Sequence, residues 1–221
     1  MNLNIIYICV SIMKDYKEKI DQARQEWNSL KATKKDAGLR IRDAAAILGL
    51  SEAELIITNL GESVSYLKIE NFKDFFNQIK SLEKLMILSR NDVAVHEKIV
   101  TTNELKFNED IFSISTDDFF LLLDSNFYEH VFAETLCSGS RELRSFQFFN
   151  SSGNAVLKIY LKSDHIKLYD KIISNCKTEY NYEIQKNLVS CDNNSAMINN
   201  YFKKLGFLKK KTISNKGLFR K

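Results

Sequence analysis

One short stretch of the sequence combines an imidazole and a cation at the spacing of a β-strand. Residues 93–99 read VAVHEKI, and successive side chains of a strand point to opposite faces of its sheet. His96 and Lys98 therefore share one face. A neutral imidazole can coordinate iron, and an ammonium group beside it can pair with a carboxylate. This combination suits a flat ligand that carries both a metal and acidic groups, such as heme.

The other candidate side chains lie around the last predicted hairpin or are isolated histidines. Arg144 and Lys158 occupy polar strand positions, and an arginine can hold a carboxylate through two hydrogen bonds. His130 alternates with aromatic residues and is expected to be a hydrogen-bonded strand histidine, with a ligand role left open. His165 is expected to be solvated at the start of a surface helix. The sequence contains no glycine-rich phosphate loop, nucleophile elbow or HExxH motif.

These side chains must be positioned by the elements that hydrophobic periodicity predicts. Apolar residues three and four apart predict helices, and alternation predicts strands. The expected helices cover residues 14–31, 39–48, 51–59, 71–81 and 164–175, the last of them capped by Ser163. The expected strands cover residues 64–69, 84–89, 93–100, 105–115, 118–124, 128–134, 143–150 and 155–161. This order indicates an α+β fold with an antiparallel sheet, N-terminal helices and a C-terminal flanking helix.

Length and composition indicate one folded domain with short extensions. The 221 residues are 44% hydrophobic and 27% charged, which is the balance of an ordinary folded protein. Residues 13–178 are expected to form the domain, because Met13 opens an ordinary protein start. Residues 1–12 are interpreted as a leader or a loose extension outside the fold.

No membrane span is expected. The longest apolar run, residues 5–13, is far shorter than the roughly 20 residues that cross a bilayer. No basic residue precedes this run, so it is a poor secretory signal, and a cytoplasmic location is expected. The cysteines are far apart and are expected to be reduced: Cys9, Cys137, Cys176 and Cys191.

Positive charge is concentrated at the C-terminal end. Residues 193–221 contain eight Lys or Arg residues and no Asp or Glu. The rest of the chain carries the remaining 24 basic side chains against all 28 acidic ones, a net charge of −4. Residues 179–221 are therefore expected to be a basic tail, and the body is not a general binder of polyanions.

Residues 40–60 have the rhythm of a DNA-reading helix-turn-helix, with Gly49 between two short helices. A recognition helix must approach phosphates, yet residues 51–59 include Glu52 and Glu54 and no Lys or Arg. A DNA-binding regulator stays open as an alternative, but nucleic acid is not an expected partner.

Three blocks of the sequence carry a family resemblance. Residues 38–45 (GLRIRDAA) with 51–55 (SEAEL), residues 88–98 (LSRNDVAVHEK), and residues 141–149 (RELRSFQFF) with 153–160 (GNAVLKIY) occur in the expected order. Together they resemble the N-terminal half of the bacterial HemS/ChuS hemin-degrading factor family, over about residues 35–175. The resemblance implies a large curved antiparallel sheet with flanking helices and a cytoplasmic role in the use of heme iron.

The resemblance also implies a site. The histidine of the family's Ala-Val-His-Glu motif looks like a heme ligand and falls on His96, and the candidate propionate anchors are Arg90, Lys98, Arg144 and Lys158. Hemin would be substrate or cargo. The implied alternatives are degradation, with oxygen and an external reductant, and carriage or storage without turnover.

The sequence also departs from the family. Full-length relatives have two homologous halves, and the basic tail is interpreted as a remnant of the junction to the second half. The histidine and the arginine of the family's main site fall, without gaps, on Asn199 and Leu122, which cannot replace them. A truncated, inactive relic is therefore a further alternative. Pairing of two copies is also expected, because single-domain relatives imitate the two-half architecture in this way.

Overall fold

The computed structural model describes residues 3–33, 39–91, 94–108, 110–138 and 141–180; of residues 3–16 and 138 it describes only the backbone. Every described residue belongs to one compact unit, which lies within residues 1–189. The predicted basic tail therefore lies almost entirely outside the described residues.

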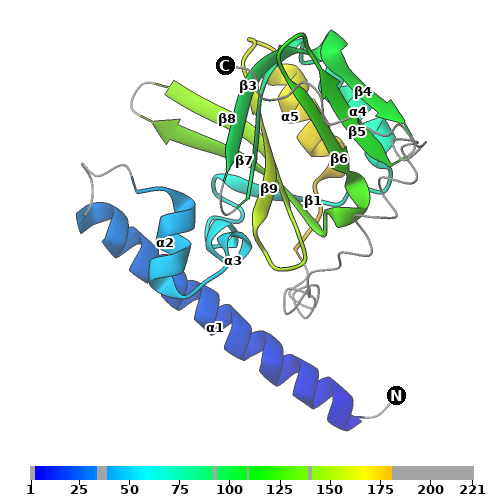
Figure 1. The fold of residues 1–221 in the computed structure, drawn as a ribbon. Coiled ribbons are helices and arrows are strands. Elements are labelled where there is room, and N and C mark those ends of the chain that lie inside the picture. Colours follow the sequence, from blue (N-terminus) through cyan, green and yellow to red (C-terminus); the bar gives the residue numbers. More distant parts are fainter. Residues whose placement is uncertain (1–2, 34–38, 92–93, 109, 139–140, 181–221) are drawn as a thin grey trace, which may run out of the picture. The chain divides into compact units, whose positions relative to one another are not determined.

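Figure 1 shows the helices and strands in chain order. The helices are α1 (Leu3–Thr33), α2 (Ile41–Leu48), α3 (Glu52–Ile57), α4 (Phe72–Lys80) and α5 (Ile166–Cys176), with short 3-10 turns η1 (Thr102–Glu104) and η2 (Ser125–Phe127). The strands are β1 (Val64–Leu67), β2 (Lys84–Arg90), β3 (Val95–Thr101), β4 (Leu105–Asn108), β5 (Ile111–Ser115), β6 (Phe120–Asp124), β7 (His130–Ser138), β8 (Arg141–Phe149) and β9 (Ala155–Leu161).

Strands from distant parts of the chain build one large antiparallel sheet. Its six strands follow the order β1-β7-β8-β9-β2-β3, and β4, β5 and β6 form a separate three-stranded sheet. Alternation explains the inward face: on β9, Leu157 and Ile159 are buried in the main core, whereas Lys158 between them points to the opposite face. The two faces of this sheet therefore carry different side chains, apolar ones on the core-facing side and charged ones among those on the other side.

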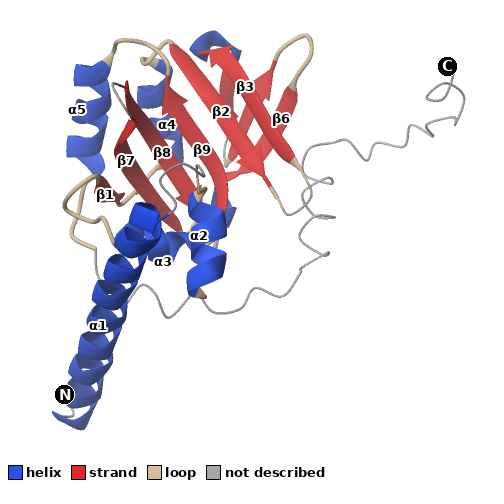
Figure 2. Cartoon of the chain, turned by 90° about the vertical axis from the view of Figure 1, so that its left-hand side faces the viewer, coloured by secondary structure: helices blue, strands red, loops and turns tan. Residues whose placement is uncertain are grey.

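One face of the large sheet is covered by α4, α5 and the small sheet. Phe75, Phe76 and Ile79 share the buried side of α4. The Phe76 ring stacks on Phe112 of β5, with ring centroids 4.3 Å apart, and on Phe148 of β8, at 5.7 Å. Burying such a side chain contributes about 1.5–3 kcal/mol. Figure 2 shows α4 and α5 on the same side of the sheet. A single helix thus joins the two sheets.

The opposite face is covered in part by the N-terminal helices. Ile20 of α1 and Ile56 of α3 are buried together with Phe132 of β7. α3 begins with a capping box, in which Ser51 and Glu54 bond to each other's backbone amides. This arrangement fixes the start of α3 against the sheet.

The chain that leaves α5 runs beside β1. The Lys68 amide donates to the Cys176 carbonyl at 2.9 Å, and the Thr178 amide donates to the Tyr66 carbonyl at 3.2 Å. Leu67 and Lys177 form an antiparallel bridge between these hydrogen bonds. The edge of the sheet at β1 is thereby covered, and β3 forms the other edge.

The predicted α+β class, with a large antiparallel sheet, N-terminal helices and a C-terminal helix, is confirmed. The expected strand 105–115 is wrong in one respect, because Asn108 pairs with Ile111 across a tight turn and the segment forms two strands. Ser163 does not cap α5, because its hydroxyl donates to the Leu82 carbonyl at 2.6 Å and His165 occupies the N-cap position.

The first helix begins at Leu3 and not at residue 14. No helix in the described part of the chain has both the length and the apolar character that crossing a bilayer requires.

Candidate functional site

His96 and Lys98 lie on β3 and share one face of the large sheet. In the register of β3 with β2, His96 lies opposite Ser89 and Lys98 lies opposite Ile87. Because Ile87 is fully buried in the main core, both side chains belong to the core-facing side of this edge strand. His96 is nevertheless exposed, since the core does not extend over this end of β3. The structure thus presents an accessible imidazole at the margin of an apolar interior.

The residues just before β6 face His96 and Lys98. The ring centroids of His96 and Phe119 are 6.4 Å apart. The Lys98 ammonium donates to both carboxylate oxygens of Asp118, at 2.6 and 2.7 Å, and the Thr116 hydroxyl donates to the same carboxylate at 2.8 Å. These hydrogen bonds hold the pKa of Asp118 below its usual value. We call the region formed by His96, Lys98, Asp118 and Phe119 the β3–β6 opening.

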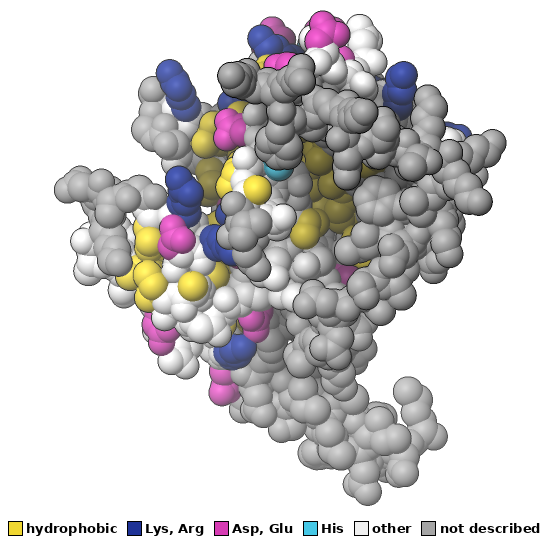
Figure 3. All heavy atoms as spheres, in the orientation of Figure 1, with side chains coloured by type: hydrophobic (Ala, Val, Ile, Leu, Met, Phe, Trp, Pro, Cys, Tyr) yellow, Lys and Arg dark blue, Asp and Glu magenta, His cyan; other side chains and the backbone are white. Residues whose placement is uncertain are grey.

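The surface near this opening is hollowed. Figure 3, in the orientation of Figure 1, shows hydrophobic side chains gathered in a hollow in the region where Figure 1 draws β3 and β9 on one side and β6 on the other. Phe119, Leu121 and Leu123 pack against the main core from this side. A flat apolar ligand could rest against such a surface with one edge toward solvent.

Arg90 and Lys158 lie on the opposite face of the sheet from His96. Lys158 is paired with Leu88, and Arg90 with Val95, so both cations alternate away from the core-facing side. Arg90 forms an ion pair with Glu52 of α3 in which both side chains are largely buried. Neither cation can therefore contact the same side of the sheet as His96.

Lys158 belongs to a buried charge cluster, which we define as Glu52, Arg90, Glu134 and Lys158. Lys158 is only 6% exposed, so its ammonium group has lost most of its contact with water. Burial lowers the pKa of Lys158, while the carboxylates of Glu52 and Glu134 oppose this shift. Burial likewise raises the pKa of Glu134, which accepts a hydrogen bond from Gln147. The cluster is a set of interacting charges inside the protein.

Arg144 lies on the same face as His96 but at a distant position. Arg144 lies on β8, where it pairs with Thr135 of β7, and it precedes Phe148 by four residues. Phe148 shares the row of Ser89 and His96. With three strand spacings between them, the two positions are separated by about 14 Å across the sheet and about 13 Å along it. Arg144 instead pairs with Glu142. Of the five predicted site residues, the structure therefore brings only Lys98 to His96, whereas Arg90 and Lys158 lie together in the buried charge cluster.

The other two histidines differ in burial. His130 is 1% exposed, and neither ring nitrogen has a hydrogen-bond partner in the described part of the chain, so the expected hydrogen-bonded histidine is wrong. Its ring lies near Tyr66 and Phe132, with centroids 6.4 and 6.5 Å away. Burial lowers the pKa of His130 to about 4. His165 is partly exposed and lies 3.6 Å from a Glu83 carboxylate oxygen.

Sequence reasoning missed Asp118 and Phe119 as neighbours of His96. Their proximity depends on how the small sheet packs beside the large one, which periodicity does not encode. Leu122 alternates away from Leu121 and Leu123, which pack against the core, and Asn199 lies outside the described residues. Among the described residues, no group of three His, Cys, Asp or Glu side chains could hold a metal ion by itself.

Comparisons with known proteins agree on one family. A model described as the haemin-degrading HemS.ChuX domain matches residues 49–175. The structure of holo-PhuS, a heme-binding protein from Pseudomonas aeruginosa, is 26% identical with a TM-score of 0.64, covering 72% of this chain and 46% of PhuS. The heme degrading enzyme ChuS from Escherichia coli O157:H7 is 23% identical with a TM-score of 0.69, covering 81% of this chain and 53% of ChuS.

A shorter protein matches over most of its length. The crystal structure of ChuX is 14% identical with a TM-score of 0.53, covering 64% of this chain and 93% of ChuX. The present chain thus spans about half the length of PhuS and ChuS. At the identities of ChuS and ChuX, the similarity establishes the fold. A search of curated proteins finds no match.

Proposed function

The chain belongs to the haemin-degrading HemS/ChuX domain family, and from this premise we propose that it binds hemin with His96 as the iron ligand. The observation that carries the proposal is the exposure of His96 at the β3–β6 opening, next to Phe119, which packs against the main core. A neutral imidazole is a common axial ligand of heme iron. Phe119 would provide an aromatic wall next to the coordinated imidazole.

Lys98 is the cation best placed to hold a propionate in this arrangement. Its ammonium group lies on the same face as His96 and is only 30% exposed, but it is occupied by Asp118. A propionate would have to share or replace the Asp118 carboxylate. The other three predicted anchors do not reach a porphyrin that His96 ligates. Arg90 and Lys158 lie on the opposite face of the sheet, and Arg144 lies far from His96 on the same face.

Degradation and carriage are both compatible with these residues. PhuS is described as a heme-binding protein and ChuS as a heme degrading enzyme. For turnover, bound hemin would supply the iron that activates oxygen, with electrons from an external reductant. The chain's own part would be axial ligation by His96, propionate pairing by Lys98 and partial exclusion of water by Phe119. We place this activity in the cytoplasm, with two copies of the chain pairing as a homodimer.

The helix-turn-helix alternative loses support from the packing of α3. Ala53, Leu55, Ile56 and Ile57 are all buried, and Glu52 is ion-paired with Arg90. A helix buried in this way cannot enter a DNA groove without leaving the fold.

A hemin titration followed by the Soret absorbance tests the proposal. We expect a saturable spectral shift in the unmodified chain and its loss in His96→Ala, because the iron ligand is removed. His165→Ala is the matched control, since His165 is a partly exposed histidine outside the β3–β6 opening. Equal spectra for the His96→Ala and unmodified chains would contradict ligation by His96.

Addition of oxygen and a reductant to the hemin complex then separates the two activities. A decay of the Soret band with release of iron would support degradation. A stable Soret band under the same conditions would favour the carrier.

A further inference from the structure

The turn between β5 and β6 connects the small sheet to β3 at the β3–β6 opening. Residues 116–119 form this turn, at the end of the register that pairs β5 with β6. Asp118 of the turn binds the Lys98 ammonium, and Phe119 lies beside His96. The conformation of the turn therefore decides where both contacts with β3 are made.

The backbone of this turn lacks the conformation that the tightest hairpins use. Those hairpins favour residues with positive φ, most often glycine or asparagine, because this conformation matches the twist of the strands. The turn here reads Thr-Asp-Asp-Phe, and neither Asp117 nor Asp118 has a positive φ. The two neighbouring carboxylates also repel each other. Backbone preference alone therefore does not specify this turn, and hydrogen bonds from its side chains become important.

Thr116 supplies hydrogen bonds from both its amide and its hydroxyl. The amide donates to the Phe119 carbonyl at 2.9 Å. The hydroxyl donates to an Asp118 carboxylate oxygen at 2.8 Å and lies 3.4 Å from the Phe119 carbonyl oxygen. Because a hydroxyl has a single proton to donate, the shorter contact, with the carboxylate, is the stronger one. The amide of Thr116 thus holds Phe119, whereas its side chain holds Asp118.

Asp118 in turn holds the Lys98 ammonium. Its carboxylate accepts hydrogen bonds from Lys98 at 2.6 and 2.7 Å, although the Asp118 side chain is 70% exposed. An ion pair between exposed, flexible side chains is weak, because ordering both of them costs entropy and water competes for each. The Thr116 hydroxyl already restricts the carboxylate, so less freedom is lost when Lys98 binds to it. Firm pairing of Lys98 with Asp118 therefore depends on Thr116.

We propose that Thr116 is a positioning residue that regulates the proposed hemin site through Asp118. While Thr116 holds Asp118 in place, an incoming propionate must compete with a fixed carboxylate for Lys98. The strength of this competition then sets the affinity of the site for an acidic ligand. This regulation rests on the proposed function, whereas the link from Thr116 to Lys98 exists in the unliganded chain.

Acylation of the full unliganded chain with acetic anhydride, followed by mass spectrometry, tests the link to Lys98. An amine in an ion pair reacts slowly, because its charged form is favoured and does not react. We expect Lys98 to react about twofold faster or more in Thr116→Val, which removes the hydroxyl but keeps the shape of the side chain. Thr116→Ser keeps the hydroxyl and should restore the slow reaction. Lys106, an exposed lysine on β4, is the internal reference.

A double-mutant cycle on hemin affinity tests the consequence at the site. We expect Thr116→Val to tighten hemin binding about twofold, because Asp118 then competes less firmly for Lys98. The same substitution should have no effect in the Asp118→Asn background, because the carboxylate that Thr116 positions is already gone. A purely structural role of Thr116 would change hemin affinity equally in both backgrounds.

Two results would overturn the proposal. One is equal acylation of Lys98 in Thr116→Val and the unmodified chain. The other is an equal effect of Thr116→Val on hemin affinity with and without Asp118→Asn. If Lys98 reacts faster in Thr116→Val but the unmodified chain does not bind hemin, the positioning by Thr116 is supported and the proposed function fails.

Discussion

The two faces of the large sheet each carry a histidine and cations, yet they treat them in opposite ways. On the core-facing side, His96 is exposed and Lys98 forms a surface ion pair with Asp118. On the other side, His130 is sealed among aromatic rings, and Arg90 is largely buried against Glu52. The same residue types therefore serve different purposes on the two faces.

The difference follows from what covers each face. The main core covers one side but ends before the outer part of β3, so the side chains there stay accessible. α3 covers the other side at Glu52, so charges there lose most of their hydration and must be compensated. Accessibility suits ligand binding, whereas compensated burial makes stability sensitive to each charge.

Removal of Glu52 should have the largest effect on stability. Glu52→Ala leaves the buried cations Arg90 and Lys158 without their nearest carboxylate, and breaking a buried pair in this way costs about 3–5 kcal/mol. Chemical denaturation measures the loss in the free energy of unfolding.

The matched control for this substitution is Glu62→Ala. Glu62 has a side chain that is 66% exposed and lies 3.4 Å from Arg24, so its loss should cost only about 0–1 kcal/mol. If both substitutions cost the same, the contrast between a hydrated and a buried set of charges would not hold.

The second largest expected effect is a loss of folding stability at low pH, caused by protonation of His130. Its pKa is lowered to about 4 in the fold, against about 6.5 in the unfolded chain. The unfolded chain therefore binds a proton first, and stability present above pH 6.5 falls between about pH 6.5 and 4, by up to about 3 kcal/mol. Denaturation midpoints across this pH range measure the slope.

His130→Leu should flatten this slope, because leucine has no proton to bind. His165→Ala is the matched control, because it removes a partly exposed histidine and leaves the buried one in place. A slope that survives His130→Leu would assign the acid sensitivity to other groups.

The smallest expected effect concerns Asp118 on the accessible face. Asp118→Asn should leave the denaturation midpoint nearly unchanged, because the Asp118 side chain is 70% exposed and its pair with Lys98 lies at the surface. It should tighten hemin binding a few-fold, because Lys98 becomes available for a propionate. Glu142→Gln is the control, since it releases Arg144 far from His96 on the same face. Weaker hemin binding by Asp118→Asn would argue against Lys98 as an anchor.

Much of the fold could be predicted because apolar residues recur at every second position in most strands and three or four residues apart in most helices. β9 is an example, since Leu157 and Ile159 enclose Lys158 in an alternating run that matches the observed strand. The turn between β4 and β5 was missed although the sequence signals it. The inward apolar positions change from odd numbers, Leu105 and Phe107, to even numbers, Phe112 and Ile114, across a polar segment at residues 108–110. Helix capping at Ser163 was mispredicted because the hydroxyl found a more distant partner, the Leu82 carbonyl.

The candidate site was only partly predictable. His96 and Lys98 share a face by simple parity within one strand. The sequence could not show which face Arg90 takes relative to them. That face depends on the register of β2 with β3, which pairs His96 with Ser89 and leaves Arg90 on the other side. Lys158 occupies a polar strand position of the kind that usually faces water, but in the fold it is buried beside Glu52 of α3.

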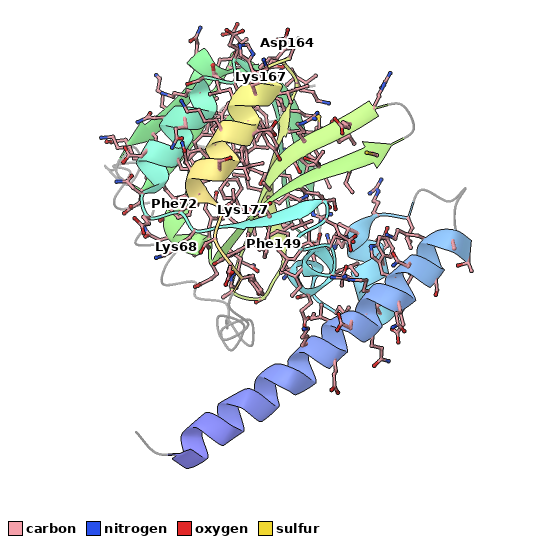
Figure 4. All side chains as sticks on the ribbon, turned by 180° about the vertical axis from the view of Figure 1, so that it is seen from behind. Lys68, Phe72, Phe149, Asp164, Lys167 and Lys177 are labelled. Carbon is pink, nitrogen blue, oxygen red and sulfur yellow. The ribbon has the colours of Figure 1, made fainter. Side chains whose placement is uncertain are left out.

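The covered edge at β1 has a consequence for association with other chains. Figure 4 labels Lys68 and Lys177, which mark where the chain beyond α5 lies along β1 and occupies its backbone hydrogen-bonding groups. Among the described residues, no strand pairs with the outer side of β3. An extended peptide that lengthens this sheet must therefore attach along β3, next to the His96 imidazole. Binding of a ligand at His96 and addition of a strand to the sheet would therefore compete for the β3 edge.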